Sequence, residues 1–104
     1  MEMHEFRKTF KSAIGTSFHD VTVTTTYNTL VQILGDPNHG KSGDGKTNYE
    51  WVVTDKNGNV CTIYDWKEYR DIDFDENITW HIGGKNSAIE NKLAEYIEEQ
   101  IELM

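Results

Sequence analysis

The fold is decided by residues 48–66, which read NYEWVVTDKNGNVCTIYDW. Two runs rich in β-branched and aromatic residues, Asn48–Thr54 and Val60–Trp66, stand on either side of the turn Asp55–Asn59. An Asn-Gly pair between two such runs is the strongest short-range signal for a β-hairpin, because both residues accept the positive φ that tight turns need. We therefore predict an antiparallel hairpin here.

On the N-terminal side of this hairpin, Val21–Thr25 alternates and is β-branched, which predicts a strand. Thr26 can cap a helix over Tyr27–Leu34, and Gly35 with Pro37 ends it. Further upstream, apolar residues recur at three- and four-residue steps and predict a short N-terminal helix ended by a glycine; they are Met3, Phe6, Phe10 and Ile14, with Gly15 after them.

On the C-terminal side, Ile78–Ile82 predicts another strand, which Gly83-Gly84 is expected to break. A helix follows from Asn86 or Ser87 to the end. Its apolar side groups Ile89, Leu93, Ala94, Ile97, Ile101 and Met104. The predicted order is α-β-α-β-β-β-α, an α+β domain with an antiparallel sheet of about four strands and helices on one face.

Length and composition limit the classes of protein to which this chain can belong. The 104 residues are sized for one domain, and a hydrophobic content of 37% supplies a core. The lone Cys61 excludes an internal disulfide, and no long apolar run or signal peptide is present, so we expect a soluble, unexported, cytoplasmic protein without membrane contact. The formal charge of −8 makes direct binding to nucleic-acid phosphates unfavourable.

The net negative charge of the chain comes entirely from its second half. Residues 49–104 hold thirteen acidic and five basic residues, whereas the first 48 residues are balanced. Four glutamates lie on the side of the C-terminal helix opposite its apolar residues, and three aspartates precede the last strand: Glu95, Glu98, Glu99 and Glu102, with Asp71, Asp73 and Asp75. These acids predict either a surface for a basic partner or simple solubility.

A second pattern predicts a small-ligand site. A predicted strand ends at Gly83 and Gly84, Lys85 follows, and a helix begins near Ser87. The backbone N–H groups of this junction can hold an anion such as a phosphate. Trp66 or Trp80 would then stack on the base of a nucleotide-type ligand. The alternative is an ordinary strand-to-helix turn with a cap. A literal Walker A string at residues 35–42 follows a predicted helix rather than a strand, so we interpret it as a chance match.

No catalytic or metal pattern emerges. The histidines and Cys61 lack metal-ligand spacing, and a Cys61–histidine pair has no local signature. We therefore predict neither a metal nor another cofactor, and no enzyme activity. If Tyr64 and Trp66 face outward from the sheet, they are expected to anchor an interface.

Several short motifs that contain tryptophan or glycine are shared with one group of proteins. They are Thr26-Tyr27, Leu34-Gly35-Asp36-Pro37, Asp44-Gly45-Lys46-Thr47, Glu50-Trp51, Thr62–Lys67 and Trp80–Gly84. This pattern, TYxxLxxxLGxP…DGKTxxEW…TIYDWK…WHIGG, resembles small bacteriophage proteins over about residues 22–85. The resemblance implies a phage-encoded protein acting in the host cytoplasm, where such proteins often bind and block a host or defence protein.

The sequence therefore predicts a non-enzymatic acidic protein that binds the basic surface of a host or defence protein, with its glutamates and aspartates in place of phosphates. The alternative is a protein that binds or sequesters a small, nucleotide-type ligand. A homodimer through a sheet edge or the C-terminal helix is also open.

Overall fold

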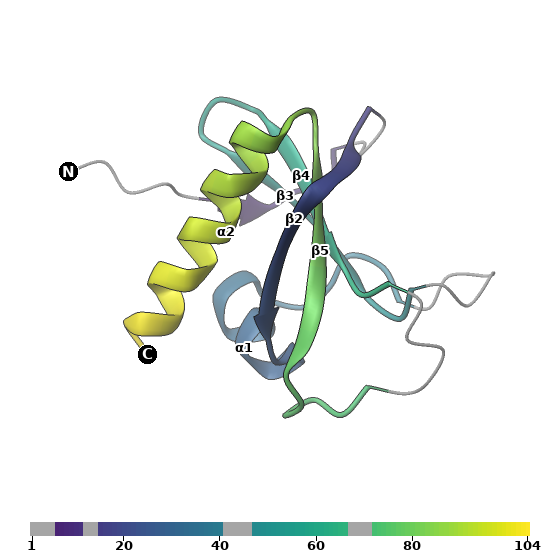
Figure 1. Cartoon of the computed structure of the whole chain (residues 1–104), viewed down its shortest axis with the longest axis vertical. Helices are drawn as coiled ribbons and strands as arrows, with labels where there is room; N and C mark the ends of the chain where they lie inside the picture. Colours follow the sequence, from purple (N-terminus) through teal and green to yellow (C-terminus); the bar gives the residue numbers. More distant parts are fainter. Residues whose placement is uncertain (1–5, 12–14, 41–46, 67–71) are drawn as a thin grey trace.

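The computed structural model describes residues 6–11, 15–40, 47–66 and 72–104. It shows a five-stranded, fully antiparallel sheet in the order β1-β3-β4-β5-β2, with α1 and α2 on one face (Figure 1). The elements are β1 (Phe6–Lys8), β2 (Ser17–Thr25), α1 (Tyr27–Leu34), β3 (Glu50–Asp55), β4 (Val60–Tyr64), β5 (Ile78–Gly84) and α2 (Ser87–Glu102). The predicted α+β class is confirmed, with five strands instead of about four.

The predicted hairpin is present as β3 and β4. Trp51 lies opposite Ile63 in the register, and Gly58 has the positive φ of 84° that the turn needs. The Asp55 carboxylate closes the turn, because it accepts hydrogen bonds from the backbone N–H groups of Asn57 and Asn59 at 2.9 and 2.8 Å. A short side chain that binds the backbone two residues ahead favours a turn over a continued strand.

The start and end of α1 also agree with the prediction. The Thr26 hydroxyl accepts a hydrogen bond from the Thr29 backbone N–H at 3.0 Å, which satisfies one unpaired donor of the first turn. Gly35 follows with a φ of 84°, and its N–H donates to the Val31 carbonyl at 2.8 Å. These two caps fix a short helix between β2 and the hairpin.

The predicted N-terminal helix is wrong. Phe6–Lys8 forms the strand β1, which pairs with β3 through Phe6↔Asp55 and Lys8↔Val53; Met3 and Ile14 lie outside the described residues. Phe6 is 5% exposed and joins the core. Pairing along the edge of β3 satisfies the backbone of this segment and buries its aromatic ring, and this tertiary contact outweighs a helical spacing of only four residues.

The last strand extends further than predicted, because Gly83 and Gly84 belong to β5 and pair with Phe18 and Ser17 of β2. A Cβ atom on Gly83 would lie 2.6 Å from the Thr62 hydroxyl oxygen. One on Gly84 would lie 2.9 Å from a side-chain carbon of α2. Both glycines are therefore needed for close packing within and above the sheet.

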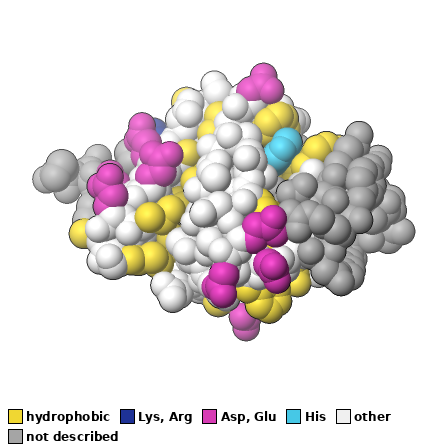
Figure 2. Space-filling model, turned by 60° about the horizontal axis from the view of Figure 1, so that its bottom comes forward, with side chains coloured by type: hydrophobic (Ala, Val, Ile, Leu, Met, Phe, Trp, Pro, Cys, Tyr) yellow, Lys and Arg dark blue, Asp and Glu magenta, His cyan; other side chains and the backbone are white. Residues whose placement is uncertain are grey.

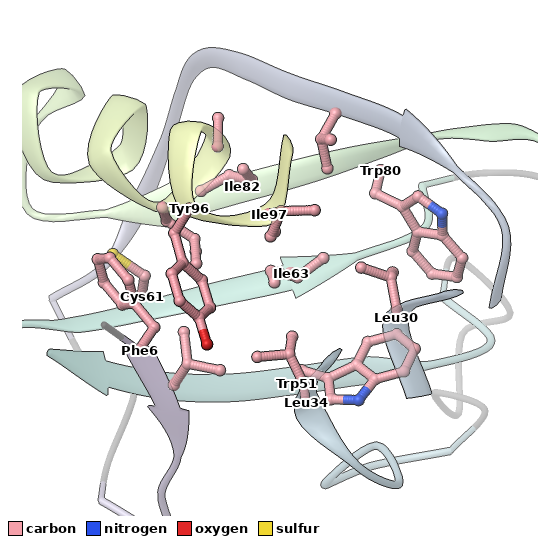
Figure 3. Packing of buried hydrophobic residues seen from close by; sticks show 14 of the residues in the cluster. Phe6, Leu30, Leu34, Trp51, Cys61, Ile63, Trp80, Ile82, Tyr96 and Ile97 are labelled. Carbon is pink, nitrogen blue, oxygen red and sulfur yellow. The ribbon is translucent and has the colours of Figure 1, made fainter. Parts of the chain in front are cut away.

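The core fills the space between the sheet and the two helices (Figure 3). Trp51 and Trp80 are fully buried and meet edge to face, with ring centroids 5.4 Å apart. The Trp80 indole N–H donates to the Thr25 carbonyl at 3.0 Å, so its one polar atom is satisfied. Burying a large apolar side chain contributes about 1.5–3 kcal/mol, so these rings hold the helix layer on the sheet.

Within the described residues, no helix has the length and apolar character needed to cross a membrane.

Candidate protein-binding surfaces

The α2 glutamate face is formed by Glu95, Glu98, Glu99 and Glu102. Asn86 begins the helix, since its side chain accepts from the Ile89 backbone N–H at 3.1 Å. The helix buries its opposite side on the sheet, and all four glutamates are exposed, as the periodicity predicted. The last turn of α2 contains no basic residue.

The aspartates lie elsewhere. Asp73 and Asp75 are exposed in the turn that precedes β5, and Asp71 is outside the described residues. The Asn28 side-chain amide donates to Asp75 Oδ1 at 2.6 Å, which ties this turn to the first residues of α1. Asp73 and Asp75 therefore lie in a turn tied to α1 and not on α2. Figure 2 shows Asp and Glu side chains of the described residues in several groups on one face of the molecule.

A tyrosine–phenylalanine cluster stands beside these aspartates. It consists of Tyr27 from the start of α1, Tyr49 from the segment before β3, and Phe74 from the turn before β5. Phe74 stacks on Tyr27 with centroids 4.3 Å apart and an angle of 24° between the rings, and Tyr49 lies 4.6 Å from Tyr27. Phe74 remains 48% exposed. Three separate segments thus build one partly exposed aromatic surface.

A second group of rings, the sheet-face aromatic row, crosses the face of the sheet opposite the helices. Phe18 stacks on His81 at 4.5 Å, His81 lies 5.7 Å from Tyr64, and Tyr64 lies 6.1 Å from Trp66. Phe18 is 38% and Trp66 40% exposed, so these rings face outward, as an interface anchor requires. Glu50 pairs with Tyr64 in the register, and burial together with this carboxylate raises the pKa of the Tyr64 hydroxyl.

The residues predicted to form a small-ligand site differ in their exposure. Gly83 and Gly84 are buried strand residues, whereas Lys85 and Ser87 are exposed at the turn into α2. Trp80 is 0% exposed, so it offers no ring face on which a base could stack. Trp66 is exposed but belongs to the sheet-face aromatic row.

A buried carboxylate lies where β2 bulges. Between Phe18 and Thr22 the register with β5 shifts, and Asp20 has a positive φ of 66°. This bulge brings His19 Nδ1 into hydrogen-bond contact with Glu90, which is fully buried in the first turn of α2. The other Glu90 oxygen, Oε1, is buried with no hydrogen-bond partner among the described residues.

Cys61 is also fully buried. Burial, aided by the nearby charges of Glu90 and Asp55, raises the pKa of its thiol to about 12. The thiol therefore stays protonated at neutral pH, which is the opposite of what an activated nucleophile needs. Within the described ranges, His, Cys, Asp and Glu form no group that could hold a metal ion.

Sequence reasoning missed two buried acids. Glu90 lies three and four residues before Leu93 and Ala94, so its position on the apolar side of α2 was already visible in the spacing. Asp65 is 0% exposed and accepts hydrogen bonds from the backbone N–H groups of Asn48 and Tyr49, each at 2.8 Å. No local pattern predicts the burial of Asp65, because its partners come from the segment before β3, sixteen and seventeen residues earlier in the chain.

Comparison with known proteins finds no match, whether with family models, curated proteins or solved structures.

Proposed function

We propose that this chain is a non-enzymatic acidic protein that binds a basic surface of a partner protein and blocks the nucleic-acid contacts of that surface. The observation that supports it is the α2 glutamate face, where four carboxylates stay exposed along one side of the longest helix. Regularly placed carboxylates can occupy the positions that phosphates take on a basic surface.

This arrangement has an energetic cost. Glu95 with Glu99, and Glu98 with Glu102, are like-charged pairs one helical turn apart, and each pair destabilises the helix by about 0.2–0.5 kcal/mol. The last three glutamates also lie near the negative end of the helix dipole. These like-charge repulsions oppose helix formation, and a role in binding or in solubility would account for them.

The net negative charge of this protein indicates a partner with a positively charged surface. A protein with a formal charge of −8 is steered toward a positively charged surface, and the rate of that encounter falls as salt screens the charges. In the setting that the phage resemblance implies, such a surface belongs to a host or defence protein that handles nucleic acid.

The test compares two charge-matched variants. Glu98→Gln removes one charge from α2, and Asp20→Asn removes one exposed charge from the bulge of β2. Each tagged protein is used to capture partners from bacterial lysate at low and high salt, and the captured partner is then purified and titrated in competition with DNA. We expect the α2 variant, and not the control, to lose the partner.

Equal retention of the partner by both variants, with folding checked by circular dichroism, would reject α2 as the contact surface. A partner that tolerates high salt would contradict an electrostatic contact.

A further inference from the structure

The tyrosine–phenylalanine cluster combines exposed aromatic surface with negative charge. Phe74 is 48% exposed, although Tyr27 stacks against it at 4.3 Å and Tyr49 lies 6.3 Å away, edge to face. An aromatic side chain left this exposed forgoes part of the free energy that its burial could contribute. The position therefore favours a surface that is completed by a partner.

The turn that carries Phe74 is held in place before any partner arrives. The Asn28 backbone N–H donates to the Phe74 carbonyl at 3.0 Å, and its side chain donates to Asp75. Within the turn, the Glu76 N–H donates to the Asp73 carbonyl at 3.1 Å. A ring that is already oriented loses little conformational entropy on binding.

Carboxylates surround the rings. Asp73 and Asp75 are the chain neighbours of Phe74, and both are exposed. The charge of Asp36 also acts on this cluster, since burial, Tyr49 and Asp36 together raise the pKa of the Tyr27 hydroxyl. The negative faces of the rings and the carboxylates attract the same kind of ligand, which is a cation.

We propose that this surface binds an arginine side chain presented by a partner protein, with the guanidinium stacked on Phe74 and hydrogen-bonded to Asp73. Arginine fits because its planar group stacks on a ring while its N–H fork reaches a carboxylate. Lysine is also attracted to the ring and the carboxylate, but it has neither the planar group that stacks nor the N–H fork, and nucleic-acid phosphates are repelled. This surface is separate from the α2 glutamate face, so the two are tested independently.

The test measures the preference for arginine over lysine. Two fluorescent peptides of equal length and charge, one of arginine and one of lysine, are titrated into the protein by fluorescence anisotropy at about 0.15 M salt. We expect the arginine peptide to bind about two- to fivefold more tightly, because its guanidinium adds planar stacking and a forked hydrogen bond to the attraction that lysine shares.

Variants locate the preference. Phe74→Ala should remove it, and Phe74→Leu should do the same while keeping apolar contact with Tyr27, so that a loss of folding is not mistaken for a loss of binding. Glu98→Gln should weaken both peptides by the same factor and leave the preference unchanged. Phe18→Ala, a similarly exposed phenylalanine of the sheet-face aromatic row, should have no effect on it.

Equal binding of the two peptides by the unmodified protein would overturn the proposal. So would a preference that survives Phe74→Leu, or one that Phe18→Ala abolishes, because the latter would move the site to the opposite face of the sheet. None of these outcomes tests the α2 glutamate face. Removing charge from that face would instead weaken the binding of both peptides by the same factor.

Discussion

At the scale of single residues, the contact between His19 and Glu90 has the clearest energetic consequence. Glu90 is fully buried, and the described residues give its carboxylate one side-chain partner, His19. A buried carboxylate that loses its donor has a large desolvation cost with little to offset it. The bulge in β2 is thus a structural requirement of α2, since it brings His19 to this position.

We predict that His19→Ala lowers the free energy of unfolding by about 1–3 kcal/mol. The reason is that Glu90 stays buried without a donor, and the measurement is urea denaturation. The matched control is His39→Ala, because His39 is 65% exposed and lies 4.0 Å from Glu50. An exposed pair of this kind contributes about 0–1 kcal/mol, so equal effects of the two substitutions would contradict the argument.

At the scale of secondary-structure elements, α2 depends on a single cap. The Asn86 side chain accepts from the Ile89 backbone N–H, whereas Ser87 is the first helical residue and is exposed. We predict that Asn86→Ala destabilises the protein by about 1 kcal/mol and that Ser87→Ala has a much smaller effect. Thermal unfolding followed by circular dichroism measures both, and a larger loss from Ser87→Ala would reassign the cap.

Elements governed by local chemistry were predictable from the sequence. The Asn57-Gly58 turn, the Thr26 cap and the glycine at position 35 each act within a few residues, so pattern reasoning located β3, β4 and α1 correctly. The α2 helix was equally clear from its periodic apolar residues, although it ends at Glu102 and Met104, which was predicted on its apolar side, is 60% exposed.

Elements governed by distant partners were not predictable. Phe6–Lys8 forms a strand because it pairs with the edge of β3. Its partners, Val53 to Asp55, are more than forty residues away in the chain, so the residues around Phe6 do not predict this pairing. Gly83 and Gly84 were expected to break a strand, but β2 pairs with them and neighbouring side chains fill the space above them. In both cases tertiary contact overrides a local preference.

At the scale of the whole molecule, the same reasoning explains what was missed of the candidate sites. Periodicity along one helix was enough to place the α2 glutamate face. The tyrosine–phenylalanine cluster draws one ring from each of three segments, so only the folded chain brings Tyr27, Tyr49 and Phe74 together. The aspartates beside it were noticed for their charge, while their aromatic neighbour was not.

The net charge of the molecule leads to a further prediction. With a formal charge of −8, the compact state repels itself, and sodium chloride screens this repulsion. We expect Tm to rise by about 2–4 °C between about 0.01 and 0.15 M salt, which corresponds to roughly 0.5 kcal/mol.

Differential scanning calorimetry measures this shift, and the Glu98→Gln, Glu102→Gln variant should show a smaller one because two of the repelling charges are gone. A Tm that falls with added salt would show that attractive ion pairs dominate the electrostatics of the folded state.

The strand order also determines when the protein can fold as it is made. β2 is synthesised early, but its partner is β5, which follows the whole β3–β4 hairpin in the chain. Until β5 emerges from the ribosome, β2 has no neighbour in the sheet and its β-branched residues remain open to wrong pairings. Contacts this distant in sequence slow folding, so β2 passes through an interval in which it is exposed and unpaired.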